Sequence, residues 1–214
     1  MSSNRGKAAR EHRVEPHDSL DDFPTPPWAA RAICEHLQAE FGLVLDAMSA
    51  WEPAYNRGAF ARGLEDYFGL LYRTDFFDYG TGNMDAVADF TMAQPGRKID
   101  FVATNPPFRL AAEFIDRALQ VAGYGCAFLV RNAFVEGENR YNALFRDNPP
   151  TQLLYFSERV VMLKGRLIRA GEIDPVASRD KGDDVKASTP RASMVAIWIK
   201  GAERRPCAWV PPGT

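Results

Sequence analysis

The chain has 214 residues, 46% hydrophobic and 25% charged, with a formal net charge of −2, and this composition is typical of a soluble globular protein with one core. The small negative charge argues against a uniformly basic nucleic-acid binder, although binding needs only a local basic patch. There is no apolar run of membrane-spanning length and no signal-like N-terminus, and the three cysteines lack disulfide or metal-ligand spacing, so we expect a cytoplasmic protein without a metal site.

Residues 1–22 predict a disordered basic tail. Arg5, Lys7, Arg10 and Arg13 stand among small and polar residues without apolar periodicity. Such a segment could contact phosphates, but a solvated terminus is the simpler interpretation.

A helix is predicted to begin within residues 23–28. Thr25 is placed to cap it, and Pro26 and Pro27 suit its first turn. Gly42 is expected to end it. Its apolar face is formed by Ala30, Ile33, Cys34, Leu37 and Phe41, which recur at helical spacing.

The next segment reads as strand, loop and helix. Residues 43–50 are apolar and predict a strand, and the helix is indicated by Ala61, Leu64, Tyr67 and Phe68. Asn56 lies in the loop between them, and asparagine is the non-glycine residue that best tolerates a left-handed backbone. A tight turn at this position is therefore expected.

A second short strand covers residues 70–75 and ends in Asp75. A carboxylate at this position of a Rossmann-like fold accepts hydrogen bonds from ribose hydroxyls. Residues 76–86 include Gly80, Gly82 and Asn83 and predict a flexible loop.

The strand predicted for residues 99–104 leads directly into Asn105, Pro106, Pro107 and Phe108. Each proline fixes φ and lacks an N–H, so this loop is stiff. The amide of Asn105 offers an acceptor and two donors, the carbonyl of Pro106 is a second acceptor, and the ring of Phe108 offers a flat face. Together they suit a planar group with an exocyclic amine, such as a nucleobase. Taken alone, the four residues fit a simple turn equally well.

Periodicity predicts the remaining elements in the same way. They are a helix over 110–122, a strand over 125–131, a helix over 136–147 with Tyr141, Leu144 and Phe145 inward, a strand over 152–157 and a last strand over 194–199.

A polar insertion is expected at about 165–190, between the last two strands. Residues 159–191 hold eight Lys/Arg against five Asp/Glu. The segment is either a solvated loop or a lid in which Lys164, Arg166 and Arg169 contact phosphates of a nucleic acid. The alternation of strands and helices over 23–210 predicts a single α/β domain.

Five segments, in order, resemble motifs of the S-adenosylmethionine-dependent amino-methyltransferases, and the resemblance covers roughly residues 23–200. They are Thr25-Pro26, Glu52-Pro53-Ala54-Tyr55-Asn56-Arg57-Gly58, Asp75, Asp89-Phe90 and Asn105-Pro106-Pro107-Phe108. Their order is that of one class of DNA adenine N6-methyltransferases. The small size, with Phe156-Ser157-Glu158-Arg159 and Lys164-Gly165-Arg166, resembles phage or prophage members. Asn56 departs from the family pattern, which has a glycine there.

The resemblance implies a Rossmann-like class I methyltransferase fold. It implies a mostly parallel sheet with helices on both faces and an antiparallel C-terminal strand. It also implies S-adenosylmethionine as cofactor and methyl transfer to N6 of adenine in DNA. The implied cofactor-binding residues are Thr25, Glu52, Pro53, Ala54, Gly58, Asp75, Asp89 and Phe90. Asn105, Pro106, Pro107 and Phe108 are the implied catalytic residues, with the flipped adenine stacked on Phe108.

Two alternatives stay open. The same loop also occurs in methyltransferases of RNA bases and, with tyrosine, of protein glutamine, although Phe108 fits a base better. Asn56 also motivates a non-enzymatic alternative, a degenerate Rossmann-like module that binds nucleic acid without cofactor.

Overall fold

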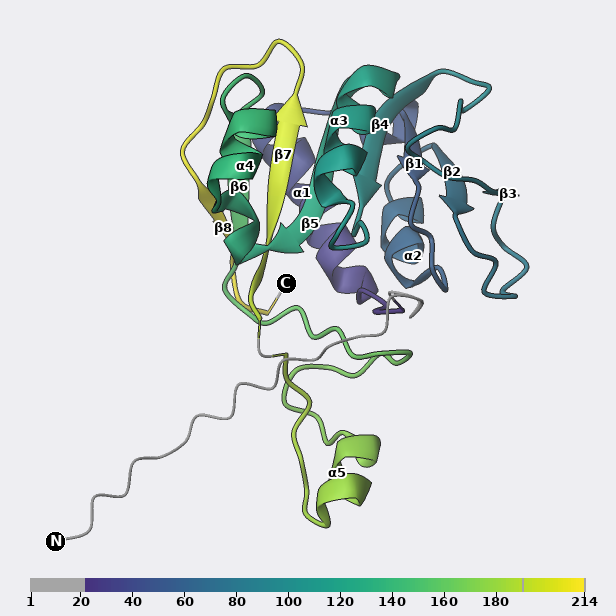
Figure 1. The fold of residues 1–214 in the computed structure, drawn as a ribbon, viewed down its shortest axis with the longest axis vertical. Helices are drawn as coiled ribbons and strands as arrows, with labels where there is room; N and C mark the ends of the chain where they lie inside the picture. The colour runs from purple at the N-terminus through teal and green to yellow at the C-terminus, as the bar shows by residue number, and fades with distance from the viewer. Residues whose placement is uncertain (1–21, 190, 214) are drawn as a thin grey trace, which may run out of the picture.

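The computed structural model describes residues 22–189 and 191–213, so the predicted tail, apart from Asp22, lies outside the described residues. These residues form an eight-stranded sheet in the order β3-β2-β1-β4-β5-β7-β6-β8 (Figure 1). The strands are β1 Ser49–Glu52, β2 Leu70–Asp75, β3 Ala86–Val87, β4 Ile99–Thr104, β5 Ala122–Arg131, β6 Gln152–Phe156, β7 Ser193–Ile199 and β8 Ala208–Val210.

The sheet is mostly parallel, as predicted. β1 pairs in parallel with β2 and β4, and β4 pairs in parallel with β5. β7 runs antiparallel between β5 and β6. The expectation that β7 is the last strand is wrong, because β8 follows it and pairs in parallel with β6. Three residues are too few to produce a periodic signal.

Helices cover both faces of the sheet. α1 Pro27–Phe41 and α2 Ala59–Glu65 pack on one face, and α3 Ala111–Val121 packs on the other. The alternation of strand side chains separates two cores: Leu129 of β5 packs with the α1 side, whereas Phe128 packs with the α3 side. None of the helices in the described ranges is long and apolar enough to cross a membrane.

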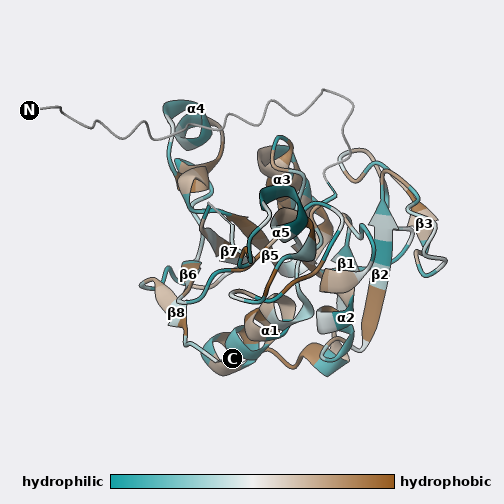
Figure 2. Ribbon diagram, turned by 90° about the horizontal axis from the view of Figure 1, so that it is seen from below, coloured by the Kyte–Doolittle hydropathy of each residue, from teal (hydrophilic) through white to brown (hydrophobic). Residues whose placement is uncertain are grey.

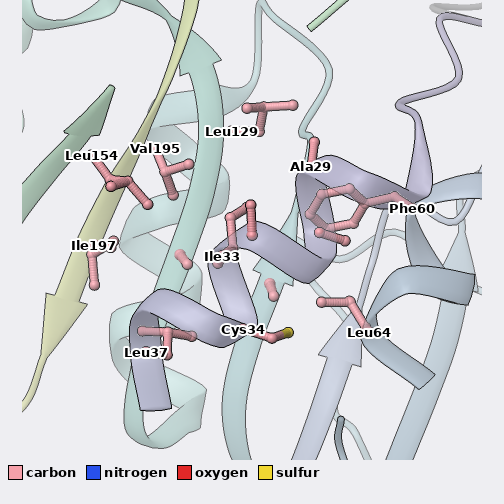
Figure 3. Close-up of a cluster of buried hydrophobic side chains, with 14 of the residues drawn as sticks. Ala29, Ile33, Cys34, Leu37, Phe60, Leu64, Leu129, Leu154, Val195 and Ile197 are labelled. Atoms are coloured by element: carbon pink, nitrogen blue, oxygen red, sulfur yellow. The ribbon is translucent and has the colours of Figure 1, made fainter. Parts of the chain in front are cut away.

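The predicted apolar face of α1 is confirmed. Ile33, Cys34 and Leu37 are fully buried; Ile33 and Leu37 lie on the side of Leu129, Val195 and Ile197, and Cys34 lies toward Leu64 of α2 (Figure 3). Burying each large aliphatic side chain contributes about 1.5–3 kcal/mol. Gly42 ends the helix in the left-handed conformation, with its N–H donating to the Gln38 carbonyl at 3.0 Å.

Two predicted elements are wrong in part. Residues 43–50 contain the 3₁₀ turn η1 Leu45–Ala47, and the strand starts only at Ser49. The predicted helix over 136–147 is broken into α4 Glu138–Arg140 and the π-helical turn η3 Tyr141–Phe145, after the 3₁₀ turn η2 Asn132–Val135. As predicted, Leu144 is buried, but Tyr141 is 55% exposed, because the wider π turn rotates it outward.

The insertion is more ordered than a solvated loop. It contains the short helix α5 Pro175–Lys181, whose N-cap Asp174 accepts hydrogen bonds from the backbone of Val176 and Ala177. α5 stands away from the sheet and is largely hydrophilic, in contrast to the hydrophobic central strands (Figures 1 and 2).

The crossing of α1 and α2 depends on Gly63. A Cβ at this position would overlap the Pro27 carbonyl oxygen and lie 2.7 Å from Ala30 Cβ. We predict that Gly63→Ala destabilises the protein by about 1–3 kcal/mol, because overpacking outweighs the roughly 1 kcal/mol gained in helix propensity. Urea unfolding measures this, with the exposed neighbour Arg62→Ala as control. An unchanged or higher midpoint for Gly63→Ala would contradict the close crossing.

Candidate active site

The ends of β1 and β4 lie side by side where the strand order of the sheet reverses. In open α/β sheets, ligands bind in the crevice at such a point, outside the carboxyl ends of the strands. Glu52 is the last residue of β1 and Thr104 the last of β4. The Thr104 hydroxyl donates a hydrogen bond to Glu52 Oε1, and both residues are fully buried.

Glu52 is an unusual buried acid. Its Oε1 also accepts the Ala54 N–H at 3.0 Å, whereas Oε2 is buried without a hydrogen-bond partner among the described residues. Burial raises the pKa of the carboxyl to about 8. The two hydrogen bonds lower the pKa, but their effect is smaller than that of burial. An unpaired buried oxygen costs about 1–3 kcal/mol, so this atom is suited to a cationic or hydrogen-bond-donating ligand.

The loop after β1 makes the tight turn that the sequence predicts. Asn56 has φ of 52° and is the non-glycine residue with positive φ among the described residues. Its N–H donates to Asp75 Oδ2 at 2.8 Å, and the N–H of Phe77 donates to Asp75 Oδ1 at 3.0 Å. Burial raises the pKa of Asp75, while these backbone bonds lower it. At Gly58, φ is 77° and a Cβ would lie 2.6 Å from Tyr55 Cζ, so glycine is required.

Asp22 joins this loop to two distant segments. It is 8% exposed. Its Oδ1 accepts a hydrogen bond from Asn56 Nδ2 at 3.1 Å, and its carboxylate forms an ion pair with Arg57 at 3.0 Å. Its carbonyl accepts the N–H of Gly165, at the start of the insertion, at 2.8 Å. Asp22, predicted to belong to the tail, is therefore part of the folded domain.

The amide of Asn105 has an anchored donor and an unpaired acceptor. Nδ2 donates to Thr25 Oγ1 at 2.8 Å and to Met162 Sδ at 3.5 Å. Oδ1 is buried and has no hydrogen-bond partner among the described residues. Thr25 also donates to Met162 Sδ at 3.6 Å. No local sequence pattern predicts this role for Met162.

The predicted capping role of Thr25 is wrong. The N-cap of α1 is Pro26, and no side chain caps the helix. The Thr25 hydroxyl is directed instead to Asn105 and Met162, and the residue is 3% exposed. The two flanking prolines keep Thr25 in extended backbone outside the helix.

Phe108 lies at the mouth of a pocket of about 490 Å³ at the carboxyl end of β5. The Arg131 guanidinium carbon is 3.6 Å from the ring centroid, and the ring of Phe23 is at 6.3 Å. Pro106 also lines the pocket and is buried, while Pro107 is partly buried.

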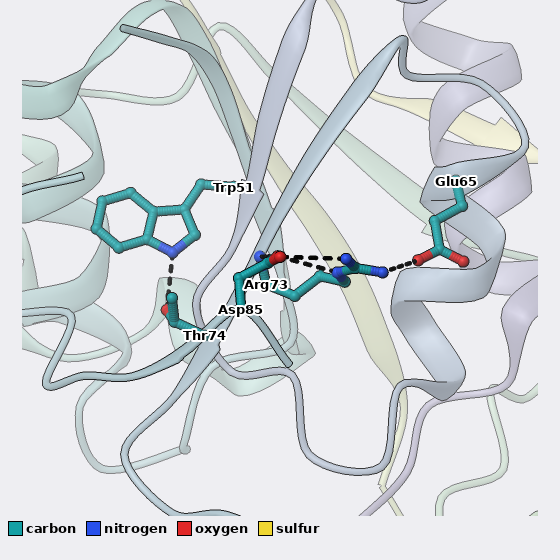
Figure 4. A network of polar contacts seen from close by, with 5 residues as sticks. All are labelled: Trp51, Glu65, Arg73, Thr74 and Asp85. Carbon is teal, nitrogen blue, oxygen red and sulfur yellow. Dashed lines mark hydrogen bonds and ion pairs between the residues drawn. The ribbon is translucent and has the colours of Figure 1, made fainter. Parts of the chain in front are cut away.

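The second strand is tied to its neighbours near the predicted cofactor residues. Trp51 Nε1 donates to Thr74 Oγ1 at 2.8 Å, and Arg73 binds both Glu65 and Asp85 at 3.0 Å (Figure 4). The link to Asp85 anchors the end of the loop over 76–86, which the sequence predicted to be flexible.

Asp89 and Phe90 lie after β3 and differ in exposure. Asp89 is exposed, and its Oδ1 accepts the Thr91 N–H at 3.0 Å. Phe90 is 1% exposed, with its ring 4.8 Å from Trp51 and 4.9 Å from Phe114. The ring of Phe90 is therefore packed in the core in this structure. Pro53 and Ala54 lie in the loop after Glu52.

The three predicted phosphate contacts do not share one environment. Arg166 forms an ion pair with Asp174, within the insertion, at 2.9 Å. Lys164 and Arg169 are exposed.

The pKa of Glu52 predicts how stability depends on pH. Because the folded pKa of about 8 lies above the ordinary value of 4.5, the native state binds more protons than the unfolded state between these values. Stability therefore falls as pH rises through this window. We predict that Glu52→Gln removes this slope and is more stable than the wild type above pH 8, by an amount on the order of a few kcal/mol.

Urea midpoints measured from pH 5 to 9 provide the test, with the exposed Glu203→Gln as control. Parallel pH curves for Glu52→Gln and the wild type would show that Glu52 does not titrate in this way.

Comparison with known proteins identifies the fold. Neither a protein-family model nor a curated protein matches the sequence. The structure is similar to the type I restriction-modification methyltransferase subunit from Streptococcus thermophilus, with a TM-score of 0.57, 11% identity and coverage of 86% of this chain and 46% of that one.

Two further solved structures agree. The modification subunit of a provisionally identified type I restriction enzyme from Vibrio vulnificus has a TM-score of 0.51 and 12% identity. The match covers 90% of this chain and 48% of that one. A protein from Pyrococcus horikoshii, provisionally described as an RNA methyltransferase, has a TM-score of 0.57, 14% identity and coverage of 86% and 89%. The chain spans about half the length of the two restriction-modification subunits. It has the Rossmann-like fold of these methyltransferases, as the sequence predicted.

Proposed function

We propose that the protein transfers a methyl group from S-adenosylmethionine to the N6 amine of adenine in DNA. The observation that carries this proposal is the amide of Asn105. Its nitrogen is held by Thr25 and Met162, and its oxygen is buried without a partner among the described residues. An unpaired acceptor directly after β4, three residues before Phe108, suits an exocyclic amine.

The residues around the loop after β1 fit the cofactor. Glu52 Oε2 would accept a hydrogen bond from the methionine ammonium, and this cation would favour the ionised carboxylate. The Asp75 carboxylate accepts the backbone N–H groups of Asn56, Phe77 and Phe76, and a carboxylate has acceptor capacity left for a ribose hydroxyl. Gly58 gives the loop its left-handed turn, and the Tyr55 ring packs directly against it. When bound, S-adenosylmethionine supplies the electrophilic methyl group on its sulfonium.

The protein's part in the reaction is orientation. Asn105 Oδ1 and the Pro106 carbonyl would accept the two N6 protons of the adenine and draw the amine toward tetrahedral geometry. Thr25 and Met162 fix the amide so that its oxygen, and not its nitrogen, faces the base. Aligned dipoles and a fixed direction of attack are the source of rate enhancement in such a site.

Nucleic acid is the favoured substrate class. The Phe108 ring offers a stacking surface for a base, which a glutamine side chain would not use. Two of the similar structures are described as DNA-modification subunits and one as an RNA methyltransferase, which supports a polynucleotide. RNA is the second candidate. The intact left-handed turn at Asn56 argues against a degenerate module.

The first experiment is tritium transfer from labelled S-adenosylmethionine to mixed-sequence DNA, RNA and protein extract, followed by nucleoside separation. Label in N6-methyldeoxyadenosine is the expected result. Label confined to RNA or protein would show that the substrate is RNA or protein and not DNA, and would leave the proposed mechanism of methyl transfer unchanged. No label in any arm, with the protein shown to be folded, would overturn the proposed activity.

The catalytic loop makes a separate prediction. Asn105→Ala should lower the transfer rate by about 10²–10³-fold or more, because it removes the dipole aimed at the amine. Cofactor affinity, measured by calorimetry, should change by less than about threefold, since the amide faces the base. The exposed Asn139→Ala is the control. An equal loss of transfer and of cofactor binding would assign Asn105 to the cofactor site instead.

A further inference from the structure

The pocket beside Phe108 carries a local excess of positive charge. Its volume of about 490 Å³ lies within the roughly 300–1,000 Å³ usual for small-ligand sites. Three arginines line it, Arg131, Arg140 and Arg191, against one carboxylate, that of Glu136. The whole chain has a net charge of −2, so this excess belongs to the pocket and not to the protein as a whole. A concave site with such a balance favours an anionic ligand.

Arg131 belongs to the wall of this pocket. Its guanidinium carbon is 3.6 Å from the Phe108 centroid, and both residues have further interactions. Its backbone pairs with Ser193 of β7. Arg131 is therefore engaged by the protein itself, and it adds charge to the site without having to move.

Arg140 divides its donors between the protein and the pocket. Its Nη1 donates to the carbonyls of Ala133, Phe134 and Glu136 at 3.1, 2.8 and 2.6 Å. Within the described ranges, its Nε and Nη2 donate no hydrogen bond, and the residue is partly exposed. Nε and Nη2 form the edge of a guanidinium that binds a phosphate through two parallel N–H groups. One side of Arg140 thus holds the pocket wall, and the other side remains available to a ligand.

Arg191 is the second available arginine. It is exposed, and its side chain makes no hydrogen bond or ion pair with the part of the chain that the structure describes. Its place in the wall is fixed by the next residue, because the Ala192 carbonyl accepts the N–H of Asn132 at 3.0 Å. Glu136 is exposed too, and among the described residues it pairs with neither Arg140 nor Arg191. An anion can therefore bind these arginines without breaking an ion pair.

A polar group in the pocket lining also indicates a ligand. Asn132 Oδ1 is buried and has no hydrogen-bond partner among the described residues. A buried acceptor is costly unless some group donates to it. A nucleotide supplies such a donor, from a base N–H or a sugar hydroxyl, beside the phosphate that suits the arginines.

We propose that Arg140 and Arg191 bind a backbone phosphate that flanks the target base in the substrate nucleic acid. Pro106 and Phe108, the loop residues that would contact the base, line the same pocket. A phosphate bound there is therefore next to the target nucleotide. Contacts to phosphates fix the register and orientation of a bound strand, so these arginines are positioning residues for the base. This inference rests on the proposed activity on a nucleic acid.

This phosphate site differs from the one that the sequence predicts. The sequence-based prediction depends on the excess of basic residues in the insertion, at Lys164, Arg166 and Arg169, and Arg166 is paired with Asp174. Arg140 and Arg191 lie in segments far apart in the sequence, and only the fold brings them to one pocket.

The test is fluorescence anisotropy with a labelled single-stranded oligothymidine that contains one central adenine, at several salt concentrations and with S-adenosylhomocysteine present. Arg191→Ala should weaken binding by about threefold or more at low salt and lower the slope of log K against log salt by about 0.7, as expected for the loss of one phosphate contact. Arg140→Lys should do the same, because lysine keeps donors for the three carbonyls but lacks the guanidinium edge. Glu136→Gln should bind about twofold more tightly or better, since it removes the opposing charge.

A second oligonucleotide locates the contact. Methylphosphonate linkages replace the two phosphates that flank the adenine and remove their charge. This replacement should cost the wild type about threefold or more in affinity and cost Arg191→Ala less than about twofold, because changes to interacting groups are not additive. The same oligonucleotide with two neutral linkages at one end is the matched control.

Arg62→Ala, on α2, is the control for loss of an exposed charge, and the amide NMR spectrum of each variant reports folding. Equal salt slopes for Arg191→Ala and the wild type, or an equal cost of the neutral linkages in both, would overturn the phosphate site. Weaker binding by Glu136→Gln, or no binding by the wild type, would also overturn it. Methyl transfer separates the two proposals: an Arg191-dependent cost of the neutral linkages without transfer leaves the phosphate site and removes the activity, and transfer without that cost does the reverse.

Discussion

The hydrogen bond between Thr104 and Glu52 joins the ends of β1 and β4, and both functional loops depend on it. The loop with Asn56 leaves the sheet directly after Glu52, and the loop with Asn105 leaves directly after Thr104. Because these strand ends are fixed to each other, the two loops keep one relative position. The cost is a buried carboxyl with a raised pKa and an unpaired oxygen. In the proposed function, that same oxygen would accept a hydrogen bond from the ammonium of the cofactor.

Around this centre, the chain uses long-range contacts to orient single groups. Asn105 is held by Thr25 and Met162, which lie 80 and 57 residues away in sequence. Asp22 connects the loop after β1, at Asn56, with the start of the insertion at Gly165. The start of the domain and the start of the insertion therefore converge on the two loops. The insertion is thus part of the site at its root, while α5 stands away from the sheet (Figure 1).

Local patterns predicted most of the fold. The strand over 70–75, the apolar face of α1 and the left-handed turn at Asn56 each depend on neighbouring residues and are confirmed. Long-range partners were not predictable. In the sequence, Met162 is an ordinary apolar residue, and Asp22 is an acidic residue at the end of the predicted tail. Phe90 shows a different limit. An aromatic residue near a ligand loop has the same sequence signal whether it faces the ligand or the core, and tertiary packing alone decides between these roles.

The two halves of the Asn105 to Phe108 loop are in different states. The amide nitrogen of Asn105 is held by Thr25, while its oxygen is buried without a hydrogen-bond partner among the described residues. The ring of Phe108 is in contact with the Arg131 guanidinium on one face. In the proposed reaction, a base that stacks on this face would therefore have to replace a contact that the protein already makes. Discrimination between substrates would then lie at the binding step, where the displaced cation–π contact must be replaced by contacts of equal strength.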